Sequence, residues 1–582
     1  MSKEESQEAE APKKDGKGGW ITFPFILGSA FGMTLAASGV TANLTVYLIK
    51  QYNVKSIDAA QIGNIVNGCI NLSPVAGAIL SDAFVGCYPV IVFSTLLSLL
   101  SLVLVTLTAA VKWLRPPPCA FGSADCQSAS SGQLAFLYIA IALTAAGCGG
   151  TRFNMLALGA SQFDKPRDQT VIFNWFFVLI YAAGIIGTTV LVFIEDSISW
   201  TLGFGLSATA NAASAVVLLS GAKYYRKPAA QGSPFTGLLQ VVVAAFRKWN
   251  VTITPANPSY YFRAINGGNI NRAKTLDQTP NGSLLGRAPT QSLRFLNRAA
   301  WICDGETKPN GSVAKPWRLC SVEQVEDFKV LLRIFPLWSS SIFISVSISI
   351  QLGLTVLQAL TMDRTVGPHF SVPASSFVVS SLASTAISLC LLDRFLLPLW
   401  HRLTRHTPTP LQRVGVGHFF NAAGMAASAL VEHARARVVR AHRKESEAGW
   451  VVPMSALWLV VPLVLVGVGE AFHFPGQVAL YYREFPSMLR NTSTGLIAVT
   501  IALGFYLSTA VIDLIRRTTG WLPDNINASR LEKVYWIVTV LTIANFSYYI
   551  ACAALYRYQN PLPEEEEEEE EEGRQQQLNV ND

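Results

Sequence analysis

The stretch that decides the fold is Gly147-Cys148-Gly149-Gly150-Thr151-Arg152, followed by Phe153 to Leu158 and then by Gly159-Ala160-Ser161-Gln162-Phe163-Asp164. It places one guanidinium inside a long apolar run. Arginine stays charged at working pH, and a charge in the middle of a membrane costs a few kcal/mol on insertion scales. Such a residue normally faces a partner or a water-filled cavity, so Arg152 is the first candidate functional residue.

Composition indicates a polytopic membrane protein. The chain has 582 residues, of which 51% are hydrophobic and only 14% are charged, and its mean hydropathy is +0.34. These values are too apolar for a soluble domain. The net charge of +7 does not indicate nucleic-acid binding, because the basic residues cluster between apolar runs, where they set topology and meet anionic lipid.

Apolar runs long enough to cross about 30 Å of hydrocarbon appear six times on each side of a long polar segment. The runs are 21–49, 60–85, 88–111, 134–158, 171–194 and 200–221, and then 328–352, 372–400, 412–433, 452–475, 493–515 and 535–556. This count predicts an all-α membrane protein with twelve transmembrane helices in two six-helix bundles. We expect an N-terminal bundle at 19–221, a central loop at 222–327 and a C-terminal bundle at 328–558.

Basic residues predict the orientation. From Lys223 through Arg318 the central segment has fourteen Lys and Arg against three acidic residues. The positive-inside rule therefore places this loop in the cytoplasm, and twelve spans place both termini there too. One segment disagrees, because five basic residues between the ninth and tenth spans would lie outside. They are Arg435, Arg437, Arg440, Arg443 and Lys444.

Both ends of the chain are polar. Residues 1–18 have mixed charge and no apolar core, which predicts a disordered cytoplasmic tail, and 559–582 contain nine consecutive Glu at 564–572. Mutual repulsion keeps such a run solvated, so we favour a solubilising tail over a docking or regulatory one. Cys119 and Cys126 share a short loop on the outer side, where a disulfide is plausible.

Few ionisable residues lie well inside the spans: Arg152, Arg333, His418 and Glu470. For His418, beside aromatic residues, a packed and hydrogen-bonded role is favoured over a proton relay. Glycines within the spans indicate close helix packing. Examples are Gly147, Gly149, Gly150, Gly184 and Gly187.

Arg152 and Glu470 belong to opposite bundles and have opposite charges, so an ion pair between them would relieve two costly burials. One interpretation is a fixed structural pair. The other is a gate, because alternating access would break the pair and an anionic substrate could compete for Arg152. Protonation of Glu470 would release Arg152 in the same way.

Further stretches carry a family resemblance. The opening stretch continues to Phe173-Asn174-Trp175-Phe176-Phe177, and with it come Gly19 to Phe25, Gly77 to Gly86, Trp200 to Gly205 and Gly469-Glu470-Ala471-Phe472. In this order and spacing, the chain resembles the plant nitrate and peptide transporter family, within the proton-dependent oligopeptide transporters of the major facilitator superfamily. It is most similar to the nitrate excretion branch.

Departures from the family pattern bear on mechanism. Proton-coupled members usually carry Glu-x-x-Glu followed by Lys or Arg in the first span, and those slots here hold Ala30, Met33 and Thr34. The common Lys of the fourth span is matched by Arg152, whose planar fork suits an oxyanion. The histidine that some nitrate-carrying relatives use in the seventh span falls near Ile348 or Ser349, so contact through that imidazole cannot operate here.

The resemblance implies a carrier of a small anion, low-affinity nitrate first, with efflux and a lack of proton coupling both allowed. We expect the anion to bind at Arg152 and Glu470 to act as the gate. The alternatives are proton-coupled transport of chloride or of a larger organic anion, hormone or peptide, and a nutrient sensor that binds without turnover. No constellation of catalytic or metal-ligating residues appears, so we expect neither an enzyme nor a metal or other cofactor. The plasma membrane is the expected location, with the tonoplast as the alternative.

Overall fold

The structure is a computed structural model in which twelve of the described helices are long and apolar enough to cross a membrane. This confirms the predicted twelve-helix, all-α fold. The described residues are 17–119, 127–227, 234–251, 260–261, 289–308, 313–405, 408–447, 449–485 and 493–558. The greater part of both predicted tails lies outside these residues.

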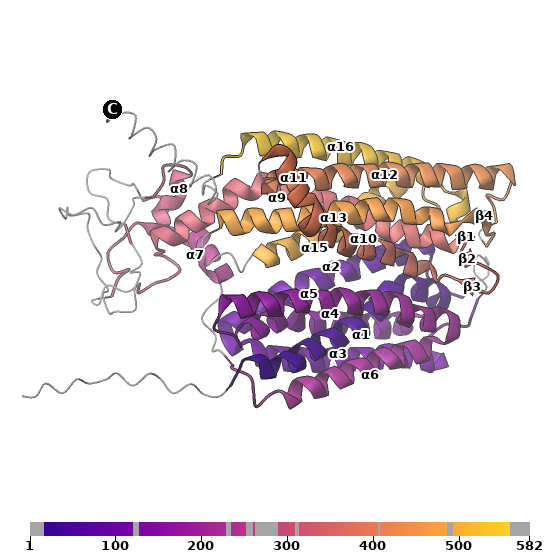
Figure 1. The fold of residues 1–582 in the computed structure, drawn as a ribbon, viewed down its shortest axis with the longest axis horizontal. Helices are drawn as coiled ribbons and strands as arrows, with labels where there is room; N and C mark the ends of the chain where they lie inside the picture. Colours follow the sequence, from indigo (N-terminus) through magenta and orange to yellow (C-terminus); the bar gives the residue numbers. More distant parts are fainter. Residues whose placement is uncertain are drawn as a thin grey trace, which may run out of the picture.

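The N-terminal half forms one bundle, drawn from indigo to magenta in the lower part of Figure 1. Its helices are α1 (Phe23–Tyr52), α2 (Ser56–Leu80), α3 (Cys87–Ala110), α4 (Ser131–Ala160), α5 (Pro166–Ile186) and α6 (Trp200–Ser220). Beyond Ile186, α5 continues through two π-helical turns, η4 (Gly187–Leu191) and η5 (Ile194–Ile198). Such turns are uncommon and often occur at functional sites.

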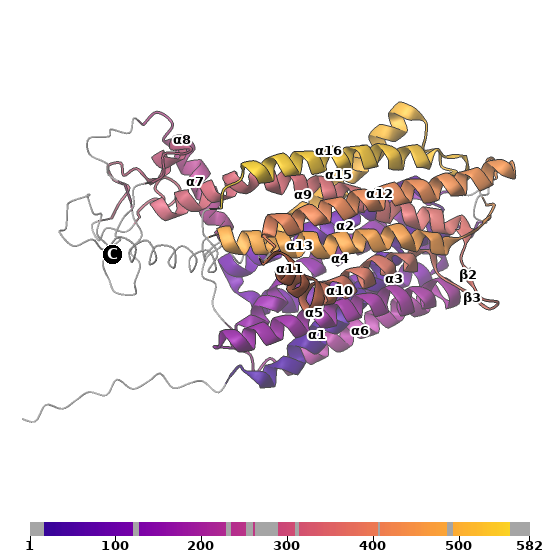
Figure 2. The ribbon, with the colours of Figure 1, turned by 45° about the horizontal axis from the view of Figure 1, so that its top comes forward.

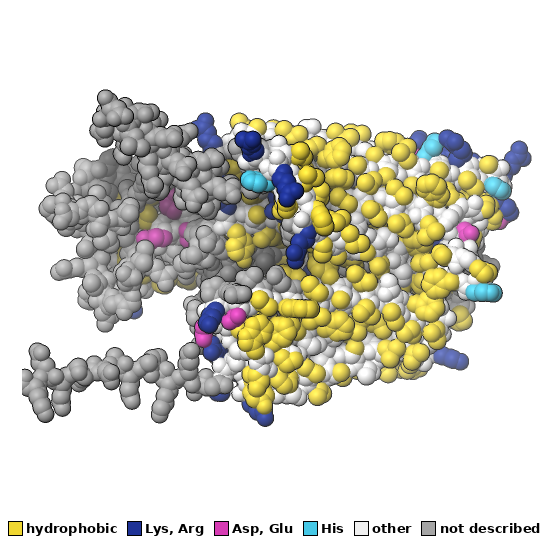
Figure 3. Space-filling model, viewed as in Figure 1, with side chains coloured by type: hydrophobic (Ala, Val, Ile, Leu, Met, Phe, Trp, Pro, Cys, Tyr) yellow, Lys and Arg dark blue, Asp and Glu magenta, His cyan; other side chains and the backbone are white. Residues whose placement is uncertain are grey.

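The C-terminal half forms the second bundle, and Figures 1 and 2 show the two lying side by side along their length. Its helices are α9 (Val322–Leu360), α10 (Val379–Leu391), α11 (Leu397–Thr404), α12 (Pro410–Ala441), α13 (Val460–Glu484), α15 (Ser493–Thr519) and α16 (Leu531–Leu555). On the face drawn in Figure 3, apolar side chains spread over both bundles, while Lys and Arg gather towards the two ends. This is the surface that a bilayer requires.

The seventh span is longer than the apolar pattern predicts. It begins at Val322 instead of 328 and ends at Leu360 instead of 352. Its start is fixed by a capping box, in which the Ser321 side chain accepts from the Gln324 backbone N–H and the Gln324 side chain accepts from the Ser321 backbone N–H. Because this cap consists of polar residues, hydropathy alone places the helix start too late.

The basic segment that disagreed with the topology is largely helical. α12 runs to Ala441, past the predicted end at 433, and it buries Arg435 to 1% exposure. The Arg435 guanidinium donates to both carboxylate oxygens of Glu432, each at 2.8 Å. Nearby, Arg440 pairs with Glu532 at 2.7 Å. The positive charges at this end are therefore partly neutralised within the fold, which a count of Lys and Arg does not detect.

The central segment contains a small packed unit. Its helices are α7 (Pro234–Arg247) and α8 (Arg294–Asn297), and its buried side chains include Val241, Ala244 and Leu296 together with Val325 of α9. A buried ion pair joins Lys248 to Glu306 at 2.6 Å. The unit therefore packs against the start of α9. We call the end of the molecule that carries it the loop end, and the opposite end the closed end.

At the closed end, polar side chains join the two bundles. Lys55 pairs with Asp524 at 2.8 Å, and Arg516 pairs with Asp58. Between described residues, the hydrogen bonds and ion pairs that join the bundles extend from this end down to Tyr506, which donates to Cys69. Among the described residues, the two bundles are thus fastened together at the closed end.

Short connections complete the closed end. Two small strand pairs, absent from the sequence prediction, lie here: β1 (Met362–Asp363) pairs parallel with β4 (Val452–Ser455), and β2 (Thr365–Val366) pairs antiparallel with β3 (Phe370–Ser371). Cys119 is disulfide-bonded. Cys126, the partner predicted for it, lies outside the described residues.

Glycines permit close contact between α2 and α4. A Cβ atom added to Gly77 would lie 2.1 Å from the Gly149 carbonyl oxygen, and one added to Gly149 would lie 2.9 Å from the Ser73 Cβ. The predicted packing role therefore holds for Gly149. It is wrong for Gly184, because a Cβ there has nothing within 4 Å.

This difference gives a stability prediction. Gly77→Ala is expected to lower the free energy of unfolding by about 1–3 kcal/mol, since the added methyl group meets backbone that cannot rotate away. Gly184→Ala is the matched control, and it should leave stability unchanged or raise it because alanine favours helix. Thermal unfolding of the two purified variants in detergent measures the effect, and equal melting temperatures would contradict this account of the α2–α4 contact.

Candidate functional site

Arg152 lies in the second half of α4 and remains exposed although it is inside an apolar span. Its Nη1 donates to Asn71 Oδ1 on α2 at 3.1 Å. Among the described residues it makes no ion pair, and the helix around it is closely packed through Gly147, Gly149 and Gly150. An exposed guanidinium that is bound only to a neutral amide retains donors for an incoming anion.

Glu470 lies on α13, in the opposite bundle, and is partly exposed. Its Oε2 accepts a hydrogen bond from Thr385 Oγ1 on α10 at 3.2 Å. The single hydroxyl hydrogen of Thr385 has two other acceptors in range, the Ser381 carbonyl at 2.9 Å and the Gly467 carbonyl at 3.1 Å. The carboxyl group is thus held by its own bundle and is not neutralised by a cation in the described part of the chain.

Tyr181 on α5 lies near both charged residues. Its side chain lies within range of the charges of both Arg152 and Glu470. Arg152, Glu470 and the tyrosine therefore face one region between the bundles. Sequence reasoning missed Tyr181, Asn71 and Thr385 because neutral polar residues are frequent in such spans and nothing in a single sequence separates these three from the rest.

The expected ion pair between Arg152 and Glu470 is not formed in this conformation. Arg152 bonds to Asn71 within the N-terminal bundle, and Glu470 bonds to Thr385 within the C-terminal bundle. The physical reason is that the bundles are fastened at the closed end, while each charged group has a polar neighbour on its own side. A fixed structural pair is therefore wrong, since each residue is accommodated without the other.

The first-span positions at which proton-coupled relatives carry glutamate are occupied here by buried apolar side chains. Ala30 is 5% exposed and Met33 is 8% exposed, and both belong to a buried cluster with Met155 and Leu158 of α4. The Thr95 hydroxyl donates to the Ile91 carbonyl at 2.7 Å, and its oxygen lies 3.8 Å from the Met33 sulfur. This part of the first span therefore contributes apolar core in place of a proton-binding site.

The other two ionisable candidates lie away from this region. Arg333 is at the loop end, where its Nη2 donates to Ser292 Oγ at 2.7 Å. His418 is fully buried and stacks on Tyr549 with ring centroids 4.5 Å apart. The packed role predicted for His418 fits this contact. Its predicted hydrogen bond is absent, because neither ring nitrogen has a partner among the described residues.

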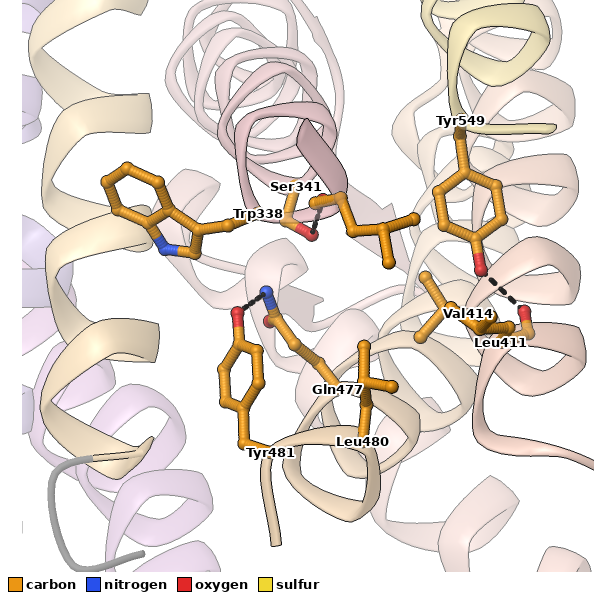
Figure 4. Close-up of a pocket in the computed structure, with 9 residues that line it drawn as sticks. Trp338, Ser341, Leu411, Val414, Gln477, Leu480, Tyr481 and Tyr549 are labelled. Carbon is orange, nitrogen blue, oxygen red and sulfur yellow. Dashed lines mark hydrogen bonds between the residues drawn. The ribbon is translucent and has the colours of Figure 1, made fainter. Parts of the chain in front are cut away.

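A small cavity lies near the loop end of the C-terminal bundle (Figure 4). Gln477 donates to the Tyr481 hydroxyl at 2.7 Å on one side, and the Tyr549 hydroxyl donates to the Leu411 carbonyl at 2.6 Å on the other. Its volume is about 10 Å³, roughly the space that one water molecule needs. It contains neither Arg152 nor Glu470, and it is too small for a transported solute.

Two six-helix bundles that enclose a few charged residues and are fastened at one end define a secondary carrier of the major facilitator type. Comparison with known sequences gives the family. The POT family profile matches residues 88–533, and the chain is 49% identical to Protein NRT1/ PTR FAMILY 2.7 of Arabidopsis thaliana over 95% of each protein. The chain belongs to the POT family and, within it, to the plant NRT1/PTR transporters.

Solved structures agree on the fold. A crystal structure of an auto-inhibited POT family peptide transporter matches with a TM-score of 0.64 at 16% identity, over 93% of this chain and 98% of that one. A POT family transporter in complex with 5-aminolevulinic acid matches with a TM-score of 0.60 at 11% identity, over 92% of this chain and 98% of that one. At these identities the likeness shows the fold alone.

Proposed function

We propose that this transporter moves a small inorganic anion, nitrate first, by alternating access. In this proposal Arg152 binds the anion and Glu470 takes part in the gate. The observation that supports the anion most directly is the state of Arg152: its guanidinium is exposed, and among the described residues its hydrogen-bond partner is the neutral Asn71. The planar guanidinium of Arg152, with its free N–H donors, can donate two parallel hydrogen bonds to two oxygens of nitrate.

In this proposal Glu470 helps to release the anion from Arg152. When the loop end closes, the bundles approach each other there, and the carboxylate would come nearer to Arg152 and to the anion. An anionic carboxylate competes with the substrate for the guanidinium, whereas a protonated one does not. In this proposal Tyr181, which lies within range of the charges of both groups, contacts the bound anion. The proposed gate is thus an ion pair between Arg152 and Glu470 that forms only when the loop end is closed.

The proposed orientation has the central loop and both termini in the cytoplasm of a plasma membrane, with the closed end facing outside. With the inside negative, an anion that leaves the cell gains about 2.3 kcal/mol per 100 mV, so export needs no proton. The apolar packing around Met33 favours this uncoupled mode because it removes one proton-binding site. Uptake against the same potential would require coupling.

The test is anion flux in proteoliposomes with voltage and pH gradients imposed separately. We expect an inside-negative voltage to drive nitrate out and a pH gradient alone to drive no net flux. The matched controls are protein-free vesicles and vesicles in which the external nitrate is replaced by the same concentration of chloride. Absence of nitrate flux under either gradient would overturn the substrate assignment, and net flux driven by pH alone would overturn the uncoupled mode.

A second candidate is proton-coupled transport of chloride or of a larger organic solute, such as an organic anion, a hormone or a peptide. The observation in its favour is that Glu470 remains on the opposite bundle with only the hydroxyl of Thr385 as its hydrogen-bond partner among the described residues. The Glu470 carboxylate opposite the Arg152 guanidinium would suit an organic solute that carries both a positive and a negative charge. Competition by such solutes against labelled nitrate distinguishes this candidate from the first.

A further inference from the structure

A second acidic side chain, outside the anion site, is buried at the closed end. Glu195 lies in the π-helical turn η5 at the end of α5, and it is 1% exposed. Its Oε2 accepts a hydrogen bond from Asn43 Nδ2 on α1 at 3.0 Å. Its Oε1 has no hydrogen-bond partner among the described residues. One oxygen of this carboxyl group is therefore removed from water without compensation.

The charged groups around Glu195 do not neutralise it. Its neighbour Asp196 takes the nearby cations, pairing with Lys50 of α1 and, at 3.9 Å, with Arg364 of the C-terminal half. From α6 the residue packed against Glu195 is Gly203, where an added Cβ would lie 2.3 Å from the Glu195 Cγ. A buried carboxylate beside another acid and without its own cation is costly, so the neutral, protonated form suits this site.

Asn43 links Glu195 directly to the other bundle. The Asn43 Oδ1 accepts a hydrogen bond from Ser375 Oγ at 2.8 Å, and Ser375 lies in η7 (Ala374–Val378), which precedes α10. The next residue, Ser376, donates to the Thr188 carbonyl in η4 at 2.9 Å. Glu195, Asn43 and Ser375 thus form a short hydrogen-bonded chain that crosses between the bundles where they are fastened.

We infer that Glu195 is the proton-binding residue that controls the gate at the closed end. With the gate shut, the carboxyl group is neutral and holds Asn43 in position for Ser375. When the bundles separate, water reaches Glu195, the proton leaves to the water on that same side, and the carboxylate is stabilised by hydration. On closing, the carboxylate takes a proton back from that water, so protons regulate the gate without being carried across.

This inference rests on the alternating-access part of the proposed function and is independent of the substrate. A single proton bound in the shut state and absent from the open state changes the ratio of the two by up to about tenfold per pH unit. Acid on the closed-end side therefore shuts the gate, and alkali opens it. Lys50 stays paired with Asp196 through this change because both belong to the N-terminal bundle, whereas the pair between Asp196 and Arg364 crosses between the bundles and separates with them.

The test is a distance measurement across the gate. Spin labels are placed at Ser128 and His369, which are exposed on opposite halves at the closed end, and the distance distribution is measured in nanodiscs at about pH 5 and about pH 8. We expect the short-distance, shut population to fall several-fold as the pH rises. In Glu195→Gln it should stay high at both pH values, because the amide oxygen still accepts from Asn43 but cannot ionise.

The matched control is Glu447→Gln, which removes an exposed carboxylate at the same end, paired with Lys444, and should keep the full pH response. If Glu195→Gln shows the same response as the unmodified chain, the inference is wrong. Ser375→Ala provides a second check, since it retains Glu195 but breaks the link and should raise the open population at about pH 5. A Ser375→Ala gate that stays shut there would equally overturn it. Because no substrate is present, failure of the nitrate assignment leaves this measurement unaffected.

Discussion

Arg152→Gln is expected to reduce nitrate flux at least tenfold in proteoliposomes that hold equal amounts of folded protein. The substitution removes the only charge that the described structure offers to an anion in this region, and a hydrogen bond to a charged group contributes about 1.5–3 kcal/mol. Glutamine keeps a polar side chain near Asn71, so the bundle should still pack. Flux of labelled nitrate under an imposed voltage measures the effect.

Two further variants sharpen this result. Arg152→Lys keeps the charge but loses the planar fork, so we expect intermediate flux and a higher KM. Arg333→Gln is the control, because Arg333 is also an arginine of a membrane helix but bonds to Ser292 at the loop end. If Arg152→Gln transports nitrate as fast as the unmodified protein, Arg152 is not the anion-binding residue, whatever the substrate proves to be.

Arg435→Met is expected to lower the free energy of unfolding by about 3–5 kcal/mol, since it leaves Glu432 buried without its cation. Glu432 is 0% exposed, and its other hydrogen bond comes from Gln358 at 2.6 Å. The variant also removes the donors to Thr361 and Asn527. Thermal unfolding in detergent measures the loss.

The control for this prediction lies two residues further along the same helix. Arg437→Met removes an exposed arginine and should change stability by less than about 0.5 kcal/mol. The double variant Glu432→Met, Arg435→Met should recover part of the loss because it leaves no unpaired charge. Should the single Arg435→Met variant melt at the same temperature as Arg437→Met, the buried pair contributes nothing to stability.

The number and order of the spans could be predicted because each needs about twenty apolar residues and the polar breaks are clear. Helix ends were less accurate. α12 continues to Ala441 because Glu432 compensates Arg435 inside the bundle. The pairing depends on two residues three apart on one helical face, whereas a positive-charge count registers only the arginines. The small unit formed by α7 and α8 was also missed, since its core is short and interrupted by polar residues.

The candidate site was partly visible in the sequence. Arg152 and Glu470 stand out because charges are rare in apolar runs. Asn71, Tyr181 and Thr385 do not stand out, since their roles follow from which helix faces meet. Glu195 was also missed, because it lies at the end of the apolar run beside Asp196, where an acidic residue is ordinarily hydrated. Its burial results from the π-helical turn and from Gly203 on the next helix.

The central unit is attached to the start of α9, so it moves together with this end of the C-terminal bundle. Val241 and Ala244 of α7 belong to one buried cluster with Val325, and Leu238 packs on the same apolar cluster as Val330 and Leu331, so the unit is attached along the helix start. At about 1.5 Å per residue, Val322–Arg333 forms an arm of about 18 Å beyond the rest of the helix. Any tilt of the bundle moves the tip of this arm furthest, so a fluorophore attached there would report the transport cycle from outside the membrane.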